Sequence, residues 1–163
     1  MEPPSDSAGL LLALIGDGPG LGEEIAKAFL CAGYRVAGLS RTSEAATALA
    51  ALPNFRHYAC DVTRNDQVIY GLQTVESELG VPSVVVYNPM QLLVKPFLEL
   101  SVEEFESVWR VSCLGAVVAA QAVLPSMLKA GHGTLIFTGA TASIRGSAKF
   151  ASLAVAKFGL RGL

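Results

Sequence analysis

The sequence predicts an α/β protein with a parallel sheet, and two observations support that prediction. Short apolar runs alternate with amphipathic stretches of helical periodicity from residue 9 to the end of the 163-residue chain. Strands that alternate with helices form βαβ crossovers, which pair the strands in parallel. Apolar residues make up 52% of the chain and charged residues 16%, as expected for strands that are buried on both faces.

Five apolar runs are expected to form the strands. They cover residues 10–16, 34–40, 55–62, 83–88 and 133–139. The run at 83–88 is continuous and β-branched, so we expect it near the centre of the sheet.

Amphipathic stretches are expected to form the helices. They cover residues 22–33, 43–52, 64–80, 101–129 and the segment from about 150 onward. Gly33, Pro53 and Gly80 are the expected stops of the first three helices. Ser101 and Glu104 have the spacing of a capping box, and Pro125 should bend the long helix or end it early.

Charge and composition exclude some partners. The formal net charge is −2, which gives no electrostatic case for nucleic acid or an anionic membrane as partner. The three cysteines form no CxxC pair and have no histidine at ligand spacing, so we expect reduced thiols and no metal site. We expect His57 and His132 at the surface, without a catalytic role.

The N-terminal sequence "MEPPSDSAG" is acidic and rich in Pro and Ser, unlike a signal or transit peptide. We expect residues 1–8 to be flexible and the protein to be cytoplasmic. At the other end, "AVAKFGLRGL" has neither a C-cap nor a polar tail, so we expect the chain to be cut within a helix.

A glycine loop joins the first expected strand to the first expected helix. Gly16, Gly20 and Gly22 permit a tight turn and close approach of the backbone to a phosphate, and the helix N-terminus favours an anion there. Pro19 removes one donor and Asp17 adds a negative charge. A turn that only packs helix on strand would have similar glycines, but the strand–loop–helix position favours dinucleotide binding.

The second expected strand ends at Ser40 and Arg41, where a dinucleotide site for the 2′-hydroxyl form normally has an acidic residue. Arginine suits a 2′-phosphate, which favours NADP over NAD. The alternative is a solvated surface arginine.

Several motifs in order resemble the short-chain dehydrogenase/reductase family over nearly the whole chain. After the glycine loop they are "CDVT", "VVVYNPM", "SVEEFESVWRVSCLGAV", "GTLIFTGATASIRG" and "LAVAK". The resemblance implies a three-layer, Rossmann-like, doubly wound parallel sheet with five strands present and the C-terminal part of the family fold missing. Residues 1–163 would then be one truncated NADP-binding domain.

The resemblance also implies a set of cofactor contacts. They are Gly16, Gly20, Leu21, Gly22, Ser40, Arg41, Asp61, Val62, Asn88 and Lys157. Asp61 matches the aspartate that holds the adenine amine, and Val62 would line the same pocket. Asn88 matches the second Asn of the family's Asn-Asn-Ala-Gly, whereas Pro89 and Met90 replace Ala-Gly.

The catalytic positions are only partly kept. Lys157 stands at the family's lysine, Leu153 at its proton-donating tyrosine, Ala140 at its serine and Ser112 at its asparagine. Leucine cannot transfer a proton, and the loss of positioned acid catalysis costs about 10²–10⁴ in rate. Without the tyrosine, Lys157 is expected to hold the nicotinamide ribose; a surface helix lysine is the alternative.

Five hydroxyls lie near the altered positions in the sequence. They belong to Tyr87, Thr138, Thr141, Ser143 and Ser152. They are weak acids, and ordinary packing is the favoured interpretation for each of them.

Two functions remain open. The first is NAD(P)-dependent hydride transfer between nicotinamide and a small carbonyl or alcohol substrate, with an eroded catalytic tetrad. The second is a catalytically silent NADP-binding scaffold, sensor or partner subunit. For the full-length protein, the resemblance implies a homodimer or homotetramer, with neither nucleic acid nor membrane as partner.

Overall fold

The structure is a computed structural model that describes residues 10–41 and 49–163. The expected flexible segment 1–8 lies outside the described residues, as does most of the helix expected at 43–52.

Within the described residues, five parallel strands form one sheet in the order β3-β2-β1-β4-β5. The strands are β1 (Leu11–Ile15), β2 (Arg35–Ser40), β3 (Phe55–Ala59), β4 (Val84–Tyr87) and β5 (Thr134–Phe137). The α/β prediction is therefore confirmed. The β-branched β4 is buried along its length between β1 and β5, as its composition predicts.

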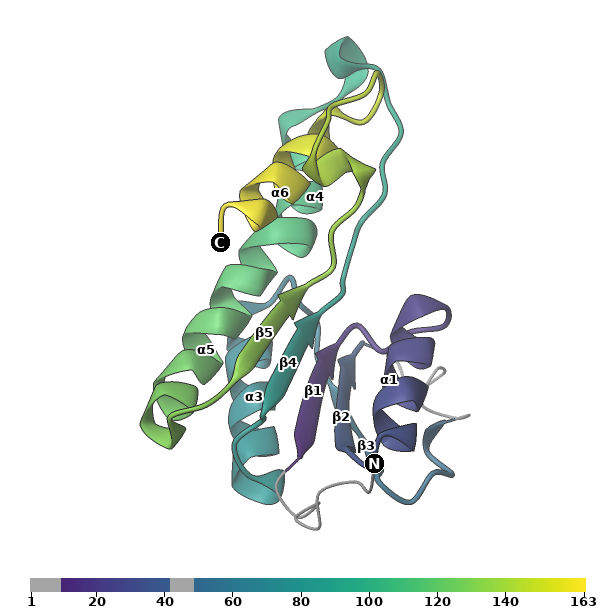
Figure 1. Ribbon diagram of the computed structural model, residues 1–163. Coiled ribbons are helices and arrows are strands. Elements are labelled where there is room, and N and C mark those ends of the chain that lie inside the picture. Colours follow the sequence, from purple (N-terminus) through teal and green to yellow (C-terminus); the bar gives the residue numbers. More distant parts are fainter. Residues whose placement is uncertain (1–9, 42–48) are drawn as a thin grey trace.

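Helices cover both faces of the sheet, which gives three layers (Figure 1). The helices α3 (Asn65–Leu79) and α5 (Gly115–Ala130) pack side by side on one face, and α1 (Leu21–Cys31) lies on the other. The helices α4 (Val102–Trp109) and α6 (Ala151–Arg161) contact each other beyond the carboxyl ends of β4 and β5. This arrangement is the doubly wound, Rossmann-like fold.

Two apolar clusters hold the helices against the two faces of the sheet, and the strand β1 contributes to both. Leu11, Ala13 and Ile15 belong to the cluster that includes α3 and α5, whereas Leu12 and Leu14 belong to the cluster that includes α1. Successive side chains of a strand point to opposite faces, so a strand covered on both sides must be apolar throughout. This is why residues 10–16 form a continuous apolar run.

The start of the long helix is as predicted. The Ser101 hydroxyl accepts a hydrogen bond from the backbone N–H of Glu104, and the Glu104 carboxylate accepts one from the N–H of Ser101. This reciprocal pair is the expected capping box at the N-terminus of α4. The segment Val102–Ala130 is long and apolar enough to cross a membrane. Its length and composition are weak evidence for a membrane span, because the buried core helix of a soluble protein can have both.

The interruption of the long helix lies at a different place from the one predicted. Pro125 does not end α5, which continues to Ala130. Proline has no N–H to donate to the backbone carbonyl of Gln121, but Gln121 is exposed, so water can bond to that carbonyl instead. Instead, a π-helical turn at Arg110–Leu114 separates α4 from α5. The sequence gives no proline or glycine inside this turn to predict it.

The side chain of Tyr87 stabilises the π turn. In an α-helix, the carbonyl of Val111 would accept from the N–H of Gly115, but that N–H bonds to Arg110. The Tyr87 hydroxyl donates to the Val111 carbonyl at 2.6 Å. A Cβ at Gly115 would collide with the Tyr87 hydroxyl, so glycine is required for this contact.

Candidate cofactor and active-site cleft

An open cleft of about 1230 Å³ runs along the carboxyl ends of the strands, where ligands bind in doubly wound sheets. Ten of the predicted site residues line it: Gly16, Leu21, Gly22, Ser40, Arg41, Asp61, Val62, Asn88, Ala140 and Lys157. Gly20, Ser112 and Leu153 do not form part of its wall. The fold thus brings most of the predicted site together.

The glycine loop has the backbone geometry that its sequence requires. Gly16 and Gly20 have φ values of +84° and +92°, which L side chains rarely adopt. A Cβ at Gly22 would collide with the carbonyl oxygen of Gly16, so the third glycine lets α1 begin against the loop. The bare backbone and the N-terminus of α1 therefore face the cleft together, an arrangement suited to a phosphate.

Asn88, at the end of β4, holds the glycine loop. Its side-chain amide donates to the Gly16 carbonyl at 3.0 Å, and its backbone N–H donates to the Ile15 carbonyl at 3.0 Å. Asn88 therefore acts on the loop as well as lining the cleft. Asn88 can hold the glycine loop because of the register in which β4 pairs with β1, and this register cannot be predicted from the sequence.

Asp17 lies inside the glycine loop but is turned away from the cleft. It is completely buried and does not line the cleft, although its neighbours Gly16 and Gly18 do. Among the described residues, neither carboxylate oxygen has a hydrogen-bond partner. A Cβ at Gly38 would collide with the Asp17 carboxylate, so this carboxylate packs against β2.

Arg41 and Asp61 lie at the adjacent ends of β2 and β3, on the wall of the cleft. The Asp61 carboxylate accepts hydrogen bonds from the backbone N–H and the hydroxyl of Thr63, at 2.9 and 2.8 Å. Partial burial by itself raises the pKa of the Asp61 carboxyl. The two hydrogen bonds from Thr63 and the nearby charges of Arg41 and Arg64 have the opposite effect and outweigh burial, so the pKa of Asp61 lies below its usual value.

Lys157 is the one buried cation of the described residues, and it reaches the cleft. Its side chain donates to the Thr138 carbonyl at 2.6 Å and is only 1% exposed. Burial lowers the pKa of Lys157, and the nearby Cys113 thiol opposes this in part. Among the described residues, no carboxylate forms an ion pair with it.

The two positions predicted to match the family's tyrosine and serine differ in their exposure to the cleft. Leu153 is 5% exposed on α6 and does not reach the cleft wall, so the position predicted for the proton donor holds a packed apolar side chain. Ala140 does line the cleft, and its N–H donates to the Ser143 hydroxyl at 3.0 Å. Neither position supplies a polar side-chain atom to the site.

Ser112 acts through a neighbour. It is completely buried in the π turn, and its hydroxyl accepts from the backbone N–H of Gln91 at 3.1 Å. The Ser107 hydroxyl donates to the side-chain carbonyl of Gln91 at 3.0 Å. Ser112 and Ser107 thus fix Gln91, a cleft residue that the sequence had not indicated.

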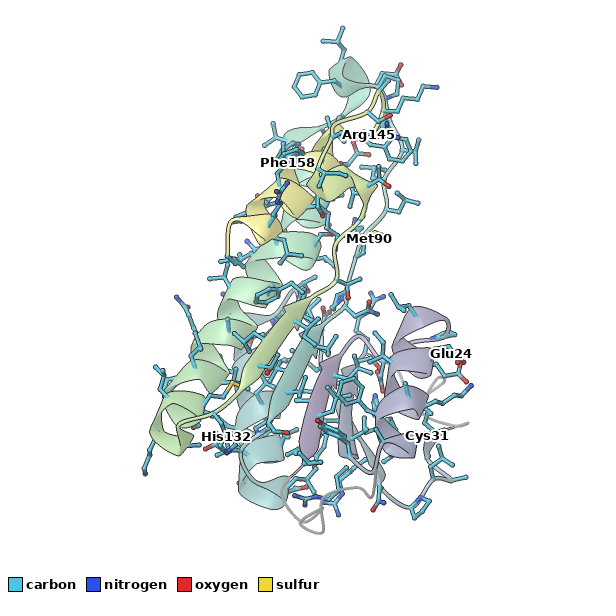
Figure 2. The ribbon with its side chains drawn as sticks, viewed as in Figure 1. Glu24, Cys31, Met90, His132, Arg145 and Phe158 are labelled. Carbon is cyan, nitrogen blue, oxygen red and sulfur yellow. The ribbon has the colours of Figure 1, made fainter. Side chains whose placement is uncertain are left out.

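The connection after β4 supplies another part of the wall that sequence reasoning missed. Met90, Gln91 and Leu92 line the cleft, and Met90 lies just beyond the carboxyl end of the sheet (Figure 2). The substitution of Pro89 and Met90 for Ala-Gly was the available signal, since larger residues at a strand end change the shape of a site.

Of the five hydroxyls near the altered positions, only Thr138 lines the cleft. Tyr87 is 1% exposed and bonded to the π turn, and burial raises the pKa of its hydroxyl well above the usual value. Its hydroxyl is therefore not available as a proton donor in the cleft. Ser143 is engaged by Ala140, and neither Ser152 nor Thr141 reaches the cleft wall.

The expectation for the histidines was wrong for one of the two. His132 is exposed, as expected, but His57 is half-buried on β3 and its Nε2 lies 3.1 Å from the Ser40 hydroxyl. The register places His57 opposite Gly38, two residues before Ser40, so no β2 side chain blocks it. Across the described residues, no group of His, Cys, Asp and Glu could hold a metal ion.

Comparison with known proteins identifies the family. The sequence model of the short chain dehydrogenase family matches residues 11–163. A D-threitol dehydrogenase of Mycolicibacterium smegmatis is 28% identical over 160 residues, which cover 95% of this chain and 62% of that protein. The chain belongs to the short-chain dehydrogenase/reductase family, and the predicted family is confirmed.

Solved structures agree with this assignment. A short-chain dehydrogenase from Rhodopseudomonas palustris has a TM-score of 0.86 and 34% identity, covering 94% of this chain and 74% of that one. An alcohol dehydrogenase from the archaeon Thermococcus sibiricus, complexed with 5-hydroxy-NADP, has a TM-score of 0.88 and 26% identity, covering 94% and 67%. This chain spans less than two thirds of the length of the curated relatives it matches, 62% and 64% for the first two.

Proposed function

We propose that the protein is an oxidoreductase that binds NADP(H) in this cleft and transfers hydride between the nicotinamide and a small carbonyl or alcohol substrate. The observation that carries the proposal is the convergence of the glycine loop, Arg41, Asp61 and Lys157 on one cleft at the carboxyl edge of the sheet. The family membership and the NADP analogue bound by a neighbour of the same fold support it.

The residues present fit such a cofactor. The glycine loop offers bare backbone beside the N-terminus of α1, which suits the pyrophosphate. Arg41 offers a planar cation for a 2′-phosphate, and Asp61 remains an ionised acceptor at neutral pH for the adenine amine. When bound, the nicotinamide would supply the hydride.

Lys157 would bind and orient the nicotinamide ribose. Its ammonium uses one of three donors on the Thr138 carbonyl, which fixes its position at the cleft wall. Gln91, held by Ser107 and Ser112, would shape the substrate end of the cleft. No tyrosine stands where the family's proton donor stands, so protonation of a substrate oxygen must use another group or water.

Cofactor preference tests the proposal most directly. We expect the chain to bind NADPH more tightly than NADH in a fluorescence titration, and Arg41→Asp to reverse that order by removing the cation and adding a charge that repels the phosphate. Arg110→Asp, on the π turn away from the cleft wall, is the matched control and should leave the order unchanged. Failure to bind either dinucleotide would rule out the proposal.

A catalytically silent NADP-binding member is the second candidate, and the burial of Leu153 outside the cleft wall favours it. The two candidates predict the same binding but differ in turnover. NADPH consumption with a panel of ketones, ketoses and 3-oxoacyl thioesters separates them. A homodimer or homotetramer and a cytoplasmic location also remain predictions.

A further inference from the structure

The turn that joins β3 to α3 holds Asp61 by its backbone and by one side of its carboxylate. The backbone N–H of Asp61 donates to the side-chain carbonyl of Gln67 at 2.9 Å, and its carbonyl accepts from the N–H of Arg64 at 3.0 Å. The carboxylate oxygen Oδ1 accepts from both the N–H and the hydroxyl of Thr63. Among the described residues, the other oxygen, Oδ2, accepts no hydrogen bond.

The two bonds from Thr63 fix the orientation of this carboxylate. The torsion that turns an aspartate carboxylate about its Cβ–Cγ bond has a broad preference of its own, so its direction depends on its hydrogen bonds. The backbone N–H at position 63 would be there with almost any residue, but the hydroxyl comes from the threonine side chain. Asp61 and Thr63 both line the cleft, whereas Gln67 does not. Thr63 thus acts on the one part of Asp61 that the backbone bonds leave free to rotate.

A carboxylate fixed in this way can distinguish between purine bases. It is ionised at neutral pH, because the pKa of Asp61 lies below its usual value, and an ionised carboxylate only accepts hydrogen bonds. Adenine has an amino group at its 6-position, which donates, whereas hypoxanthine has an oxygen there, which accepts. A charged acceptor gains a strong hydrogen bond from the first base and is repelled by the second.

We propose that Thr63 is a positioning residue for the adenine end of the cofactor: it holds Oδ1 of Asp61 so that Oδ2 meets the 6-amino group, and it thereby makes the cleft selective for adenine over a 6-oxo purine. The inference rests on the proposed function for the ligand. It depends neither on turnover nor on the choice between NADPH and NADH.

The experiment compares NADPH with its deamino analogue, in which hypoxanthine replaces adenine and the rest of the molecule is the same. A fluorescence titration gives the Kd of each for the full chain, and the NADH pair serves if the chain binds NADH more tightly. We expect the wild-type chain to bind NADPH at least about tenfold more tightly than the analogue, the effect of one hydrogen bond to a charged group. Thr63→Val, which keeps the shape but not the hydroxyl, should weaken NADPH binding about three- to fivefold and change binding of the analogue by less than about twofold.

Further variants separate positioning from a general structural effect. Thr63→Ser keeps the hydroxyl and should restore the wild-type ratio of the two Kd values. Asp61→Ala should abolish the preference for adenine, and adding Thr63→Val to it should cost nothing more. Thr74→Val is the matched control: Thr74 is half-buried like Thr63, its hydroxyl donates to the Tyr70 carbonyl within α3, and it does not line the cleft. Both Kd values should be unchanged in this control.

The outcomes distinguish this inference from the proposed function. If the wild-type chain prefers NADPH to the analogue but Thr63→Val keeps that ratio, or Thr63→Ser loses it, only the role of Thr63 is overturned. A further loss on adding Thr63→Val to Asp61→Ala would overturn it too. If the wild-type chain binds NADPH and the analogue equally, Asp61 does not read the base, and the inference falls while dinucleotide binding stands. If neither NADPH nor NADH binds, the proposed function fails and the inference with it. Should Thr63→Val not fold, Thr63→Ala removes the same hydroxyl and takes its place.

Discussion

Replacing Asp17 by alanine should make the protein more stable. The Asp17 side chain is completely buried, and both of its carboxylate oxygens lack a hydrogen-bond partner within residues 10–41 and 49–163. A buried polar group without partners costs about 2–4 kcal/mol, and more when charged. Removing it leaves a small cavity, which costs about 1 kcal/mol. The net gain in the free energy of unfolding is therefore about 1–3 kcal/mol, or a rise in Tm of roughly 2–12 °C for a chain of this length.

Urea unfolding followed by circular dichroism measures this change. Asp66→Ala is the matched control, because its side chain is 69% exposed and its ion pair with Arg64 is long, at 3.4 Å. The control should change stability by less than about 0.5 kcal/mol. Asp17→Asn keeps the shape but leaves an unpaired amide, so it should gain less than Asp17→Ala. A loss of stability in Asp17→Ala would show that the carboxylate has a partner and would refute the reasoning.

Three further predictions concern the helix turn and the site. Tyr87→Phe should lower the free energy of unfolding by about 1 kcal/mol, because the Val111 carbonyl in the π turn loses its donor. Tyr70→Phe, at an exposed position, is the control and should have no effect. Equal effects of the two variants in urea unfolding would contradict this prediction. Lys157 has a lowered folded-state pKa, so between that pKa and its ordinary value of 10.5 the unfolded chain binds more protons and stability rises with pH. Relative to Lys157→Met, the wild-type Tm should therefore gain as the pH is raised toward 10.5, and parallel Tm profiles would argue against a buried, titrating ammonium. Leu153→Tyr combined with Ala140→Ser should raise a weak NADPH-dependent carbonyl reduction by at least about tenfold, because a positioned acid contributes about 10²–10⁴; an unchanged rate would show that the pocket no longer admits the tyrosine route.

The strands were the most predictable part of the fold. A strand covered by helices on both faces must be apolar at every position, so β1 and β4 are visible as uninterrupted apolar runs. The capping box of α4 was equally visible, because both of its hydrogen bonds join residues three apart in the chain.

The π turn was not predictable, because its support comes from elsewhere in the sheet. Tyr87 lies 24 residues before Val111, and its hydroxyl compensates for a hydrogen bond that the helix itself gives up. Local propensity instead pointed to Pro125, where α5 simply continues.

The candidate site was also predictable only in part. Residues that follow directly after strands, such as Gly16, Arg41 and Asp61, meet in the cleft because parallel strands end at one edge of the sheet. Gln91 and the contact between His57 and Ser40 were missed because the residues that form these contacts are distant in the sequence.

The sequence by itself determined the class of fold and the position of the glycine loop, and it predicts that Leu153 stands at the family's tyrosine, since these depend on residue type and short spacing. The tertiary structure alone decided which of these side chains face the cleft: Lys157 does, whereas Asp17 and Leu153 are buried outside its wall. The physical reason is that strand register and helix packing fix the direction of each side chain, and both depend on contacts between segments far apart in the chain.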